Sequence, residues 1–200
     1  PNSVELKKIN KIAISKKKDE KLRIITVARY YEKKKGLDMI EEVSKEFIKN
    51  NYNFEWTLAG RNSNQLMNKN FIKQNIKYFN LVDEIKNIDE IYFPHSKLLK
   101  LYKDHDVYVN LARIESFGIT IIEAIASGLP VLSFDTKGAN ELVLDNINGY
   151  LIKNYNPKEM ADFLMSKFNL FFKGQVINTD MIKKFDLELN SKQTLINYKK

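Results

Sequence analysis

The 200-residue sequence has no cysteine, two histidines (His95 and His105) and no uninterrupted apolar run as long as a membrane span. The missing cysteines exclude disulfides and cysteine-ligated metal sites. A histidine-based metal site would need carboxylate ligands as well, and no ligand spacing indicates one, so we expect no metal. A membrane-spanning helix needs about 18 or more apolar residues in succession, so none is predicted.

The positive charge is concentrated in one part of the chain. The net charge is +8, yet residues 36–200 hold equal numbers of acidic and basic side chains, so the excess lies in residues 1–35. A basic nucleic-acid-binding module is one interpretation, and attraction to an anionic membrane surface or ligand is another. The third is a solvated, lysine-rich terminal segment. Aromatic side chains are not interleaved with the basic ones, which argues against nucleic acid.

Short runs rich in β-branched residues alternate with helical spacing along the chain. They predict strands at 22–28, 54–59, 76–82, 106–111 and 131–134. Helices are predicted from Leu37, at 64–74, at 96–102 with Ser96 as its cap, at 118–127 and in the last third of the chain. This alternation predicts an α/β fold, a Rossmann-like parallel sheet with helices on both faces.

Turn residues mark three of the element boundaries. Gly128 and Pro130 are expected to end the helix at 118–127. Asn148 and Gly149 predict a tight turn between residues 143–144 and residues 150–152. Asn156 is expected to cap a helix whose first residue is Pro157.

Two carboxylates stand where a strand leads into a buried helix. Glu123 lies among apolar residues, where a carboxylate is costly unless a partner compensates it. Glu115 precedes Gly118 and the first helical amides, which together form an anion site suited to phosphate. The competing interpretation is structural, because Thr120 and Glu123 have the spacing of a capping box. The apolar surroundings of Glu123 favour a ligand or a specific buried partner.

The exit of the first strand carries cations at both ends of its loop. Arg29 follows the strand, and Lys35 precedes Gly36 and the next helix. Two cations flanking such a loop can clamp a diphosphate. Lys33 and Lys34 are expected to be surface residues, although spacing alone does not separate Lys35 from them.

Nearly the whole chain resembles the C-terminal, donor-binding domain of retaining glycosyltransferases of the GT-B fold, family four (group 1). The segment "VARYYEKKKGLDMIEEV" resembles the family's Gly-Arg…Lys-Gly segment, with Ala28 in place of the usual glycine. The region from "LLKLYKDHDVYVNLARIESFG" to "ELVLDNINGYLI" resembles its signature, in which two glutamates are separated by seven residues. The stretch "IYFPHS" is shorter than the family's base-proximal segment and carries Pro94 and His95 where a glycine is common.

The resemblance implies a role for each matching residue. It implies that Glu115 contacts the donor sugar, that Glu123 contacts the nucleotide ribose, and that the diphosphate is held by Arg29, Lys35 and the amides that follow Glu115. The implied catalytic residues are Glu115, Arg29 and Lys35, and the implied donor-binding residues are Glu123, Ser116, Phe117, Gly118, Ile119 and His95.

The resemblance implies half of a larger enzyme, with an interdomain segment at 1–20, a nucleotide-sugar donor-binding domain at 21–185 and a C-terminal helix at 186–200. The expected reaction moves a sugar from a nucleotide-diphosphate sugar, with no further cofactor, to a glycan or lipid-linked acceptor held by an N-terminal domain. We expect a cytoplasmic bacterial protein of polysaccharide biosynthesis, with peripheral membrane association as an option and no nucleic acid. A nucleotide-sugar epimerase of related fold is the alternative enzyme, and a noncatalytic glycosyltransferase-like partner is a further alternative.

Overall fold

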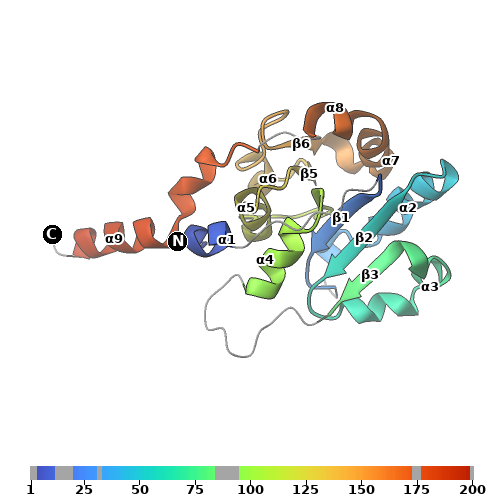
Figure 1. Ribbon diagram of the computed structural model, residues 1–200, viewed down its shortest axis with the longest axis horizontal. Coiled ribbons are helices and arrows are strands. Elements are labelled where there is room, and N and C mark those ends of the chain that lie inside the picture. Colours follow the sequence, from blue (N-terminus) through green and yellow to red (C-terminus); the bar gives the residue numbers. More distant parts are fainter. Residues whose placement is uncertain (1–3, 12–19, 31–32, 84–94, 173–176, 199–200) are drawn as a thin grey trace.

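The computed structural model describes residues 4–11, 20–30, 33–83, 95–172 and 177–198. In this part of the chain, parallel strands form one six-stranded sheet in the order β3-β2-β1-β4-β5-β6 (Figure 1). The strands are β1 Leu22–Val27, β2 Phe54–Ala59, β3 Phe79–Val82, β4 Val107–Asn110, β5 Val131–Phe134 and β6 Gly149–Ile152. The predicted α/β sheet is therefore confirmed.

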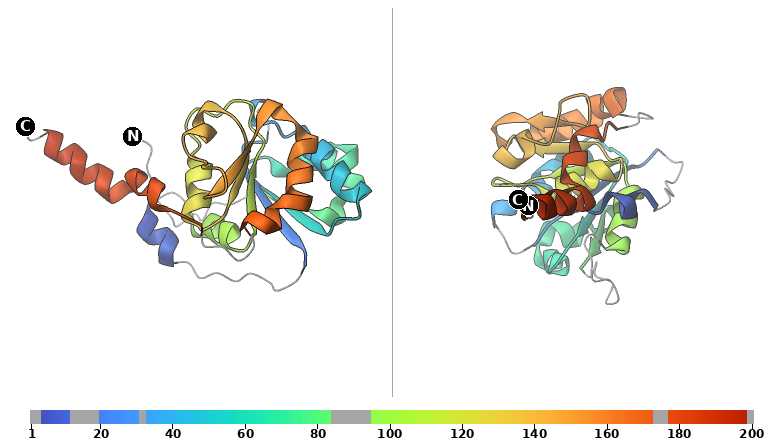
Figure 2. Two further views of the ribbon diagram at one scale, coloured as in Figure 1. Left: turned by 90° about the horizontal axis from the view of Figure 1, so that it is seen from above. Right: turned by 90° about the vertical axis from the view of Figure 1, so that its left-hand side faces the viewer.

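Helices cover both faces of the sheet. The larger ones are α2 Met39–Lys49, α4 Ser96–Lys103, α5 Ile119–Ala126 and α9 Leu187–Tyr198, and the shorter ones are α1 Leu6–Lys11, α3 Asn70–Gln74, α6 Lys137–Asn140, α7 Pro157–Asp162 and α8 Phe168–Phe172. Helices α1, α4 and α5 lie on one face, and α2, α3, α7 and α8 lie on the other (Figure 2). Helix α9 projects away from the sheet.

The order of the strands reverses in the middle of the sheet. From β1 the chain passes to β2 and β3 in one direction, and β4, β5 and β6 follow in the opposite direction from β1. The order therefore reverses between β1 and β4, which are hydrogen-bonded neighbours. Open parallel sheets bind ligands at such a switch point, outside the carboxyl ends of the strands. The loops after β1 and β4 meet at this edge.

Buried polar side chains in the sheet are paired with one another. Thr26 of β1 donates a hydrogen bond to the carbonyl of Val109 at 2.7 Å, and its oxygen accepts one from the indole N–H of Trp56 at 3.1 Å. Trp56 is fully buried, and complete burial of a large apolar side chain stabilises a fold by about 1.5–3 kcal/mol. These bonds join the three neighbouring strands β2, β1 and β4.

Several predicted boundaries shift. The interval 64–74 is a 3₁₀ segment at Ser63–Asn68 followed by α3, because Lys69 between them is extended. The interval 76–82 begins with a 3₁₀ turn at Ile76–Tyr78, so the strand is shorter than predicted. Helix α4 does begin at Ser96, but His95 occupies the capping position.

The turn predicted at Asn148 and Gly149 is wrong in detail. Gly149 already belongs to β6, which pairs in parallel with β5, and residues 143–144 form no strand. The positive φ of the turn falls on Asn146. Asn148 is fully buried. Its side-chain oxygen accepts a hydrogen bond from the N–H of Leu144 at 2.7 Å, and its side-chain NH₂ donates to the carbonyl of Leu142 at 3.0 Å. Asn148 therefore stabilises the loop before β6 from a buried position, and it is not a turn residue of a β-hairpin.

The end of the chain agrees better with the prediction. Asn156 accepts hydrogen bonds from the N–H groups of Lys158 and Glu159 at 3.1 and 3.2 Å, so its cap on α7 is confirmed. A π-helical segment, Phe163–Lys167, joins α7 to α8. Among the described residues, no helix combines the length and apolar character that a membrane crossing requires.

The described part of the predicted interdomain segment is folded. Residues Leu6–Lys11 form α1, and Val4 and Ile9 are buried. The N–H of Val4 donates to the carbonyl of Phe185 at 2.9 Å, and the N–H of Leu187 donates to the carbonyl of Val4 at 3.0 Å. This contact ties the start of the chain to the segment that leads into α9.

Candidate functional site

The loop after β4 leads into α5 and forms the centre of the site. Gly118 caps α5 with its backbone in the left-handed region, at a φ of 77°, and Gly128 follows the end of the helix as predicted. The chain before Gly118 is supported by α6, where Gly138 donates its N–H to the carbonyl of Glu115 at 2.8 Å. A methyl group on Gly138 would stand 2.8 Å from that same carbonyl oxygen, so only glycine permits the contact.

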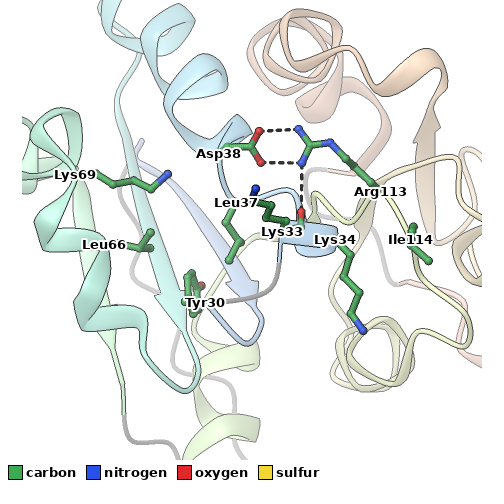
Figure 3. A pocket seen from close by; sticks show the side chains of 9 residues that line it. All are labelled: Tyr30, Lys33, Lys34, Leu37, Asp38, Leu66, Lys69, Arg113 and Ile114. Atoms are coloured by element: carbon green, nitrogen blue, oxygen red, sulfur yellow. Dashed lines mark hydrogen bonds and ion pairs between the residues drawn. The ribbon is translucent and has the colours of Figure 1, made fainter.

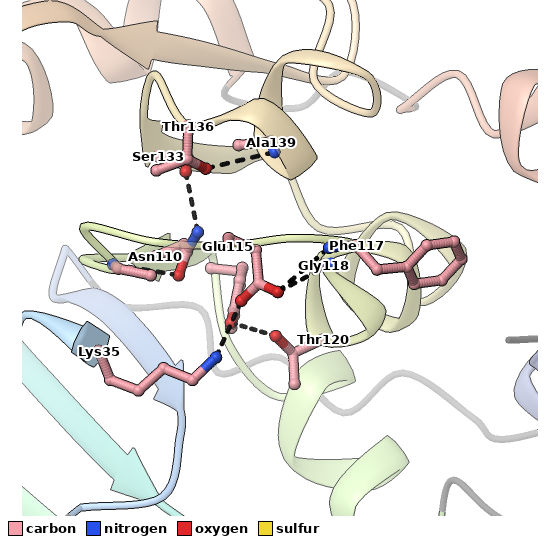
Figure 4. A network of polar contacts seen from close by, with 11 residues as sticks. Lys35, Asn110, Glu115, Phe117, Gly118, Thr120, Ser133, Thr136 and Ala139 are labelled. Carbon is pink, nitrogen blue, oxygen red and sulfur yellow. Dashed lines mark hydrogen bonds and ion pairs between the residues drawn. The ribbon is translucent and has the colours of Figure 1, made fainter. Parts of the chain in front are cut away.

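Glu115 joins the loops after β1 and β4 (Figure 4). Its Oε2 accepts a hydrogen bond and ion pair from Nζ of Lys35 at 2.9 Å. Its Oε1 accepts from the N–H of Gly118 at 3.0 Å and, more weakly, from that of Phe117 at 3.5 Å. The carboxylate thus accepts hydrogen bonds from the amides at the start of α5, where the sequence predicts an anion site.

The electrostatics of Glu115 favour its charged form. Partial burial raises the pKa of this carboxyl, but the hydrogen bond and charge of Lys35 and the N–H groups of Gly118 and Phe117 outweigh it. The net result is a pKa below the ordinary value. Glu115 is therefore ionised at neutral pH, and it makes bonds that an incoming phosphate would have to replace.

Glu123 is buried beneath this loop and is held by a tyrosine. Its side chain lies under the protein surface, and its Oε2 accepts a hydrogen bond from the hydroxyl of Tyr102 at 3.0 Å. Burial raises the pKa of Glu123 to about 7, and the Tyr102 hydrogen bond only partly offsets this. Glu123 is thus near its titration midpoint at neutral pH.

The capping-box interpretation of Glu123 is wrong. Gly118 is the capping residue and α5 begins at Ile119, so Thr120 is already inside the helix. The Thr120 hydroxyl accepts a hydrogen bond from the hydroxyl of Tyr108 at 2.7 Å. The buried partner that the apolar surroundings of Glu123 indicated is therefore Tyr102.

Arg29 and Glu115 lie at the same edge of the sheet, as the sequence predicted, because they follow the carboxyl ends of neighbouring parallel strands. The side chain of Arg29 is exposed. The structure distinguishes Lys35 from its two neighbours, which the sequence spacing does not. Lys35 pairs with Glu115, whereas Lys33 and Lys34 line a cleft.

The remaining predicted donor-binding residues differ in accessibility. Ser116 and Ile119 are exposed, and Phe117 packs its ring edge-on against Phe185 at 5.5 Å between centroids. His95 is only 4% exposed at the start of α4. Pro94 and the rest of the base-proximal stretch before it lie outside the described residues. The donor-binding roles of these residues stay predictions.

Sequence reasoning missed the pair formed by Arg113 and Asp38. The guanidinium donates two hydrogen bonds to the Asp38 carboxylate, at 2.7 and 2.6 Å. Its backbone N–H donates to the carbonyl of Lys34 at 2.8 Å. These contacts fasten the loop after β4 to the turn that carries Lys35. The sequence shows an arginine after a strand and an aspartate just before a helix. It does not show that they pair, because 75 residues separate them.

A cleft of about 730 Å³ lies beside this pair (Figure 3). It is lined by Tyr30, Lys33, Lys34, Leu37, Asp38, Leu66, Lys69, Arg113 and Ile114. The part of the chain that the structure describes contains no cluster of three or more His, Asp or Glu side chains placed to hold a metal ion.

The sequence profile of the family described as "Glycosyl transferases group 1" matches residues 7–182. The chain belongs to this family. A segment of 83 residues is 37% identical to the UDP-N-acetylglucosamine--peptide N-acetylglucosaminyltransferase GtfA subunit of Streptococcus agalactiae, covering 38% of this chain and 16% of that protein. A segment of 84 residues is 36% identical to the poly(ribitol-phosphate) alpha-N-acetylglucosaminyltransferase of Staphylococcus aureus (strain COL), covering 42% and 15%.

The fold of this group 1 glycosyl transferase chain also matches solved structures. Sucrose-phosphate synthase from Thermosynechococcus elongatus superposes with a TM-score of 0.73 at 16% identity, over 100% of this chain and 51% of that one. At this identity the likeness concerns the fold, which is the Rossmann-like architecture of GT-B glycosyltransferases. The chain spans about half of the synthase, and the matched segments span less than a fifth of the two relatives.

Proposed function

We propose that the chain is the nucleotide-sugar-binding half of a retaining glycosyltransferase. The observation that carries the proposal is the meeting of Lys35, Glu115 and the first amides of α5 at the switch point of the sheet. Family membership supports it, because glycosyl transferases of group 1 are sugar-transferring enzymes. The proposed donor is a nucleotide-diphosphate sugar lying across the carboxyl ends of β1 and β4.

The proposed binding step is an exchange of partners. The donor diphosphate takes the N–H groups of Phe117 and Gly118 that Glu115 now accepts from, with Arg29 and Lys35 balancing its charge. The carboxylate of Glu115 is then released to accept hydrogen bonds from the sugar hydroxyls. Glu123, buried one turn further along α5, is the proposed acceptor for a ribose hydroxyl.

In the proposed reaction, the bond between the anomeric carbon and the diphosphate oxygen breaks. The acceptor hydroxyl oxygen bonds to the same face of that carbon, and its proton passes to the departing diphosphate. Negative charge grows on the diphosphate as the bond breaks, so fixed donors and cations around it lower the barrier without rearranging. Arg29, Lys35 and the α5 amides are the groups proposed for this work.

The acceptor is proposed to be a glycan or lipid-linked molecule held by a further N-terminal domain, with peripheral membrane association as part of the same proposal. The names of the two relatives add a peptide and poly(ribitol-phosphate) to the acceptor classes worth testing.

A thermal-shift screen with UDP, GDP, ADP and their sugar conjugates tests the donor assignment. A ligand at one hundred times its dissociation constant stabilises the folded state by about 2.7 kcal/mol, which is a clear rise in melting temperature. Lys35→Ala should weaken binding of the responding nucleotide by roughly 1–3 kcal/mol, because a charged hydrogen bond is lost. A screen in which no nucleotide shifts the melting temperature would contradict the proposal.

A further inference from the structure

The cleft beside the Asp38–Arg113 pair has a cationic rim. Lys33, Lys34 and Lys69 are exposed along it. Arg113 is neutralised by Asp38, whose pKa is lowered mainly by the Arg113 hydrogen bonds and further by the positive charge of Lys69. Lys33 and Lys69 therefore leave the lining with an excess of positive charge, which favours an anionic occupant.

The floor of the same cleft is apolar. Tyr30, Leu37 and Leu66 are buried beneath the rim, and Ile114 stands exposed at its edge with 63% of its surface accessible. An isolated phosphate would use only the rim. A chain in which charged groups alternate with carbon-rich units, such as sugar or polyol carbons, would use both the rim and the floor.

The position of the cleft relates it to the donor network. Lys33 and Lys34 directly precede Lys35, and Arg113 and Ile114 directly precede Glu115. Lys35 and Glu115 face each other in the donor network (Figure 4), and the residues directly before each of them line the cleft (Figure 3). The cleft and the donor network are therefore built from adjoining residues of the same two loops.

The walls of the cleft are held in place before any ligand arrives. The carbonyl of Lys34 accepts from the N–H groups of Arg113 and Ile114, at 2.8 and 3.4 Å. The guanidinium of Arg113 spans to Asp38 with two hydrogen bonds and to the carbonyl of Lys33 at 3.4 Å. A site whose walls are already ordered loses little conformational entropy on binding.

We propose that this cleft is an acceptor subsite on the donor-binding half, in addition to the N-terminal domain that holds the rest of the acceptor, and that it binds an anionic acceptor, a glycan or polyol chain joined by phosphodiesters. This inference rests on the proposed function, since it places the acceptor beside the proposed donor. A single-stranded nucleic acid shares the phosphodiesters but in addition stacks its bases on aromatic rings. Tyr30 is the aromatic residue among those lining the cleft, and it is buried with its hydroxyl bonded to the carbonyl of Thr26.

The test is a fluorescence-anisotropy titration of the whole chain with a labelled glycerol-phosphate oligomer, with the nucleotide that responds in the thermal-shift screen present to occupy the donor site. Lys33→Gln and Lys69→Gln should each weaken binding about fivefold, the upper range for an exposed ion pair. Lys73→Gln is the matched control, because Lys73 is an exposed lysine four residues from Lys69 but does not line the cleft. It should leave the affinity unchanged, and added salt should weaken binding by the parent.

Two further probes decide between classes of ligand. A neutral maltooligosaccharide of matched length should bind far more weakly than the glycerol-phosphate oligomer, and a uridine RNA oligomer of matched charge should not bind more tightly. Equal losses for Lys69→Gln and Lys73→Gln, equal binding of the neutral sugar, or tighter binding of the RNA would overturn the proposal. A phosphorylated oligosaccharide, run in parallel, separates glycan from polyol acceptors.

The donor measurement keeps this proposal distinct from the proposed function. Lys69→Gln should keep the parent's thermal shift with the responding nucleotide, because Lys69 is not part of the Lys35–Glu115 network. If no nucleotide binds but the oligomer results hold, the donor assignment fails and the cleft remains a phosphodiester site. If nucleotide binds and the oligomer does not, the acceptor subsite fails alone.

Discussion

Glu115 and Glu123 are two carboxylates on one loop and helix whose surroundings move their pKa values in opposite directions. Glu115 has a cation and two N–H groups, so its charged form is favoured. Glu123 is surrounded by apolar residues and has a tyrosine hydroxyl, so its charged form is penalised. Opposed shifts of this kind are common at functional sites.

The raised pKa of Glu123 predicts a pH-dependent cost to stability. Its pKa is about 7 in the folded chain against an ordinary value of 4.5. Between these values the folded state holds a proton that the unfolded state has lost, so this residue makes the free energy of unfolding fall as pH rises. From pH 5 to pH 7.5 the parent should lose roughly 2–3 kcal/mol relative to Glu123→Gln.

Urea unfolding of the parent and Glu123→Gln at the two pH values measures this difference directly. Other titrating groups are common to both proteins and cancel in the comparison. Parallel pH profiles for the two proteins would show that Glu123 is not penalised in the folded state.

Ligand binding should separate the roles of the two glutamates. Glu123→Gln should weaken binding of the nucleoside diphosphate by on the order of tenfold, about 1.4 kcal/mol. The reason is that the group proposed to accept a hydrogen bond from the ribose hydroxyl loses its charge. Glu115→Gln should leave the diphosphate bound and weaken only the nucleotide-sugar, whose sugar is its proposed partner. Calorimetric titration of each variant with both ligands is the measurement, and parent-like binding of both ligands by both variants would remove the assignment.

At the scale of elements, the site depends on how closely the loop after β1 approaches the end of β4. Gly36 has a φ of +66°, and a methyl group there would lie 1.8 Å from the carbonyl oxygen of Leu111. Lys35 reaches Glu115 because this backbone contact brings the two loops together. The Lys35–Glu115 ion pair therefore depends on the close backbone approach that Gly36 allows.

Gly36→Ala tests this contact, with Gly128→Ala as its control. Both glycines have positive φ, but a methyl group on Gly128 meets nothing within 4 Å. Gly128→Ala should cost about 1–2 kcal/mol from backbone conformation alone. Gly36→Ala should cost roughly 1–3 kcal/mol more, because the loops must separate, and it should weaken nucleotide binding as well. Equal losses in urea unfolding would show that the contact relaxes freely.

For the whole molecule, the parallel sheet gathers the proposed chemistry at one edge. The loops after β1 and β4, the start of α5 and the cleft all lie at the carboxyl end. The opposite edge, and α9 beyond the sheet, carry none of the residues proposed to bind the donor. The arrangement matches the rule for ligand sites in open parallel sheets.

Amide hydrogen exchange should reveal this asymmetry. Addition of the responding nucleotide should slow exchange in residues 33–36 and 111–120 and leave α9 unchanged, because ligand contacts protect only the edge that they cover. The proposed division of labour also predicts that these 200 residues bind the donor without transferring its sugar. Protection spread evenly over the chain, or turnover by the chain alone, would count against the proposal.

The sequence by itself determined the alternation of strands and helices, the cap at Asn156 and the shared edge of Arg29 and Glu115. These features follow from local patterns, namely apolar periodicity, turn residues and the geometry of parallel strands. The sequence also indicated that Glu123 needed a buried partner, because its neighbours in the chain are apolar.

Only the tertiary structure decided which partners these residues have. Tyr102 reaches Glu123 across 21 residues, Lys35 reaches Glu115 across 80, and Arg113 reaches Asp38 across 75. No local pattern encodes such pairings, since they depend on which strands become neighbours and how closely their loops pack. The physical reason is that side-chain chemistry is written in the sequence, whereas its electrostatic environment is set by groups that the fold brings from elsewhere.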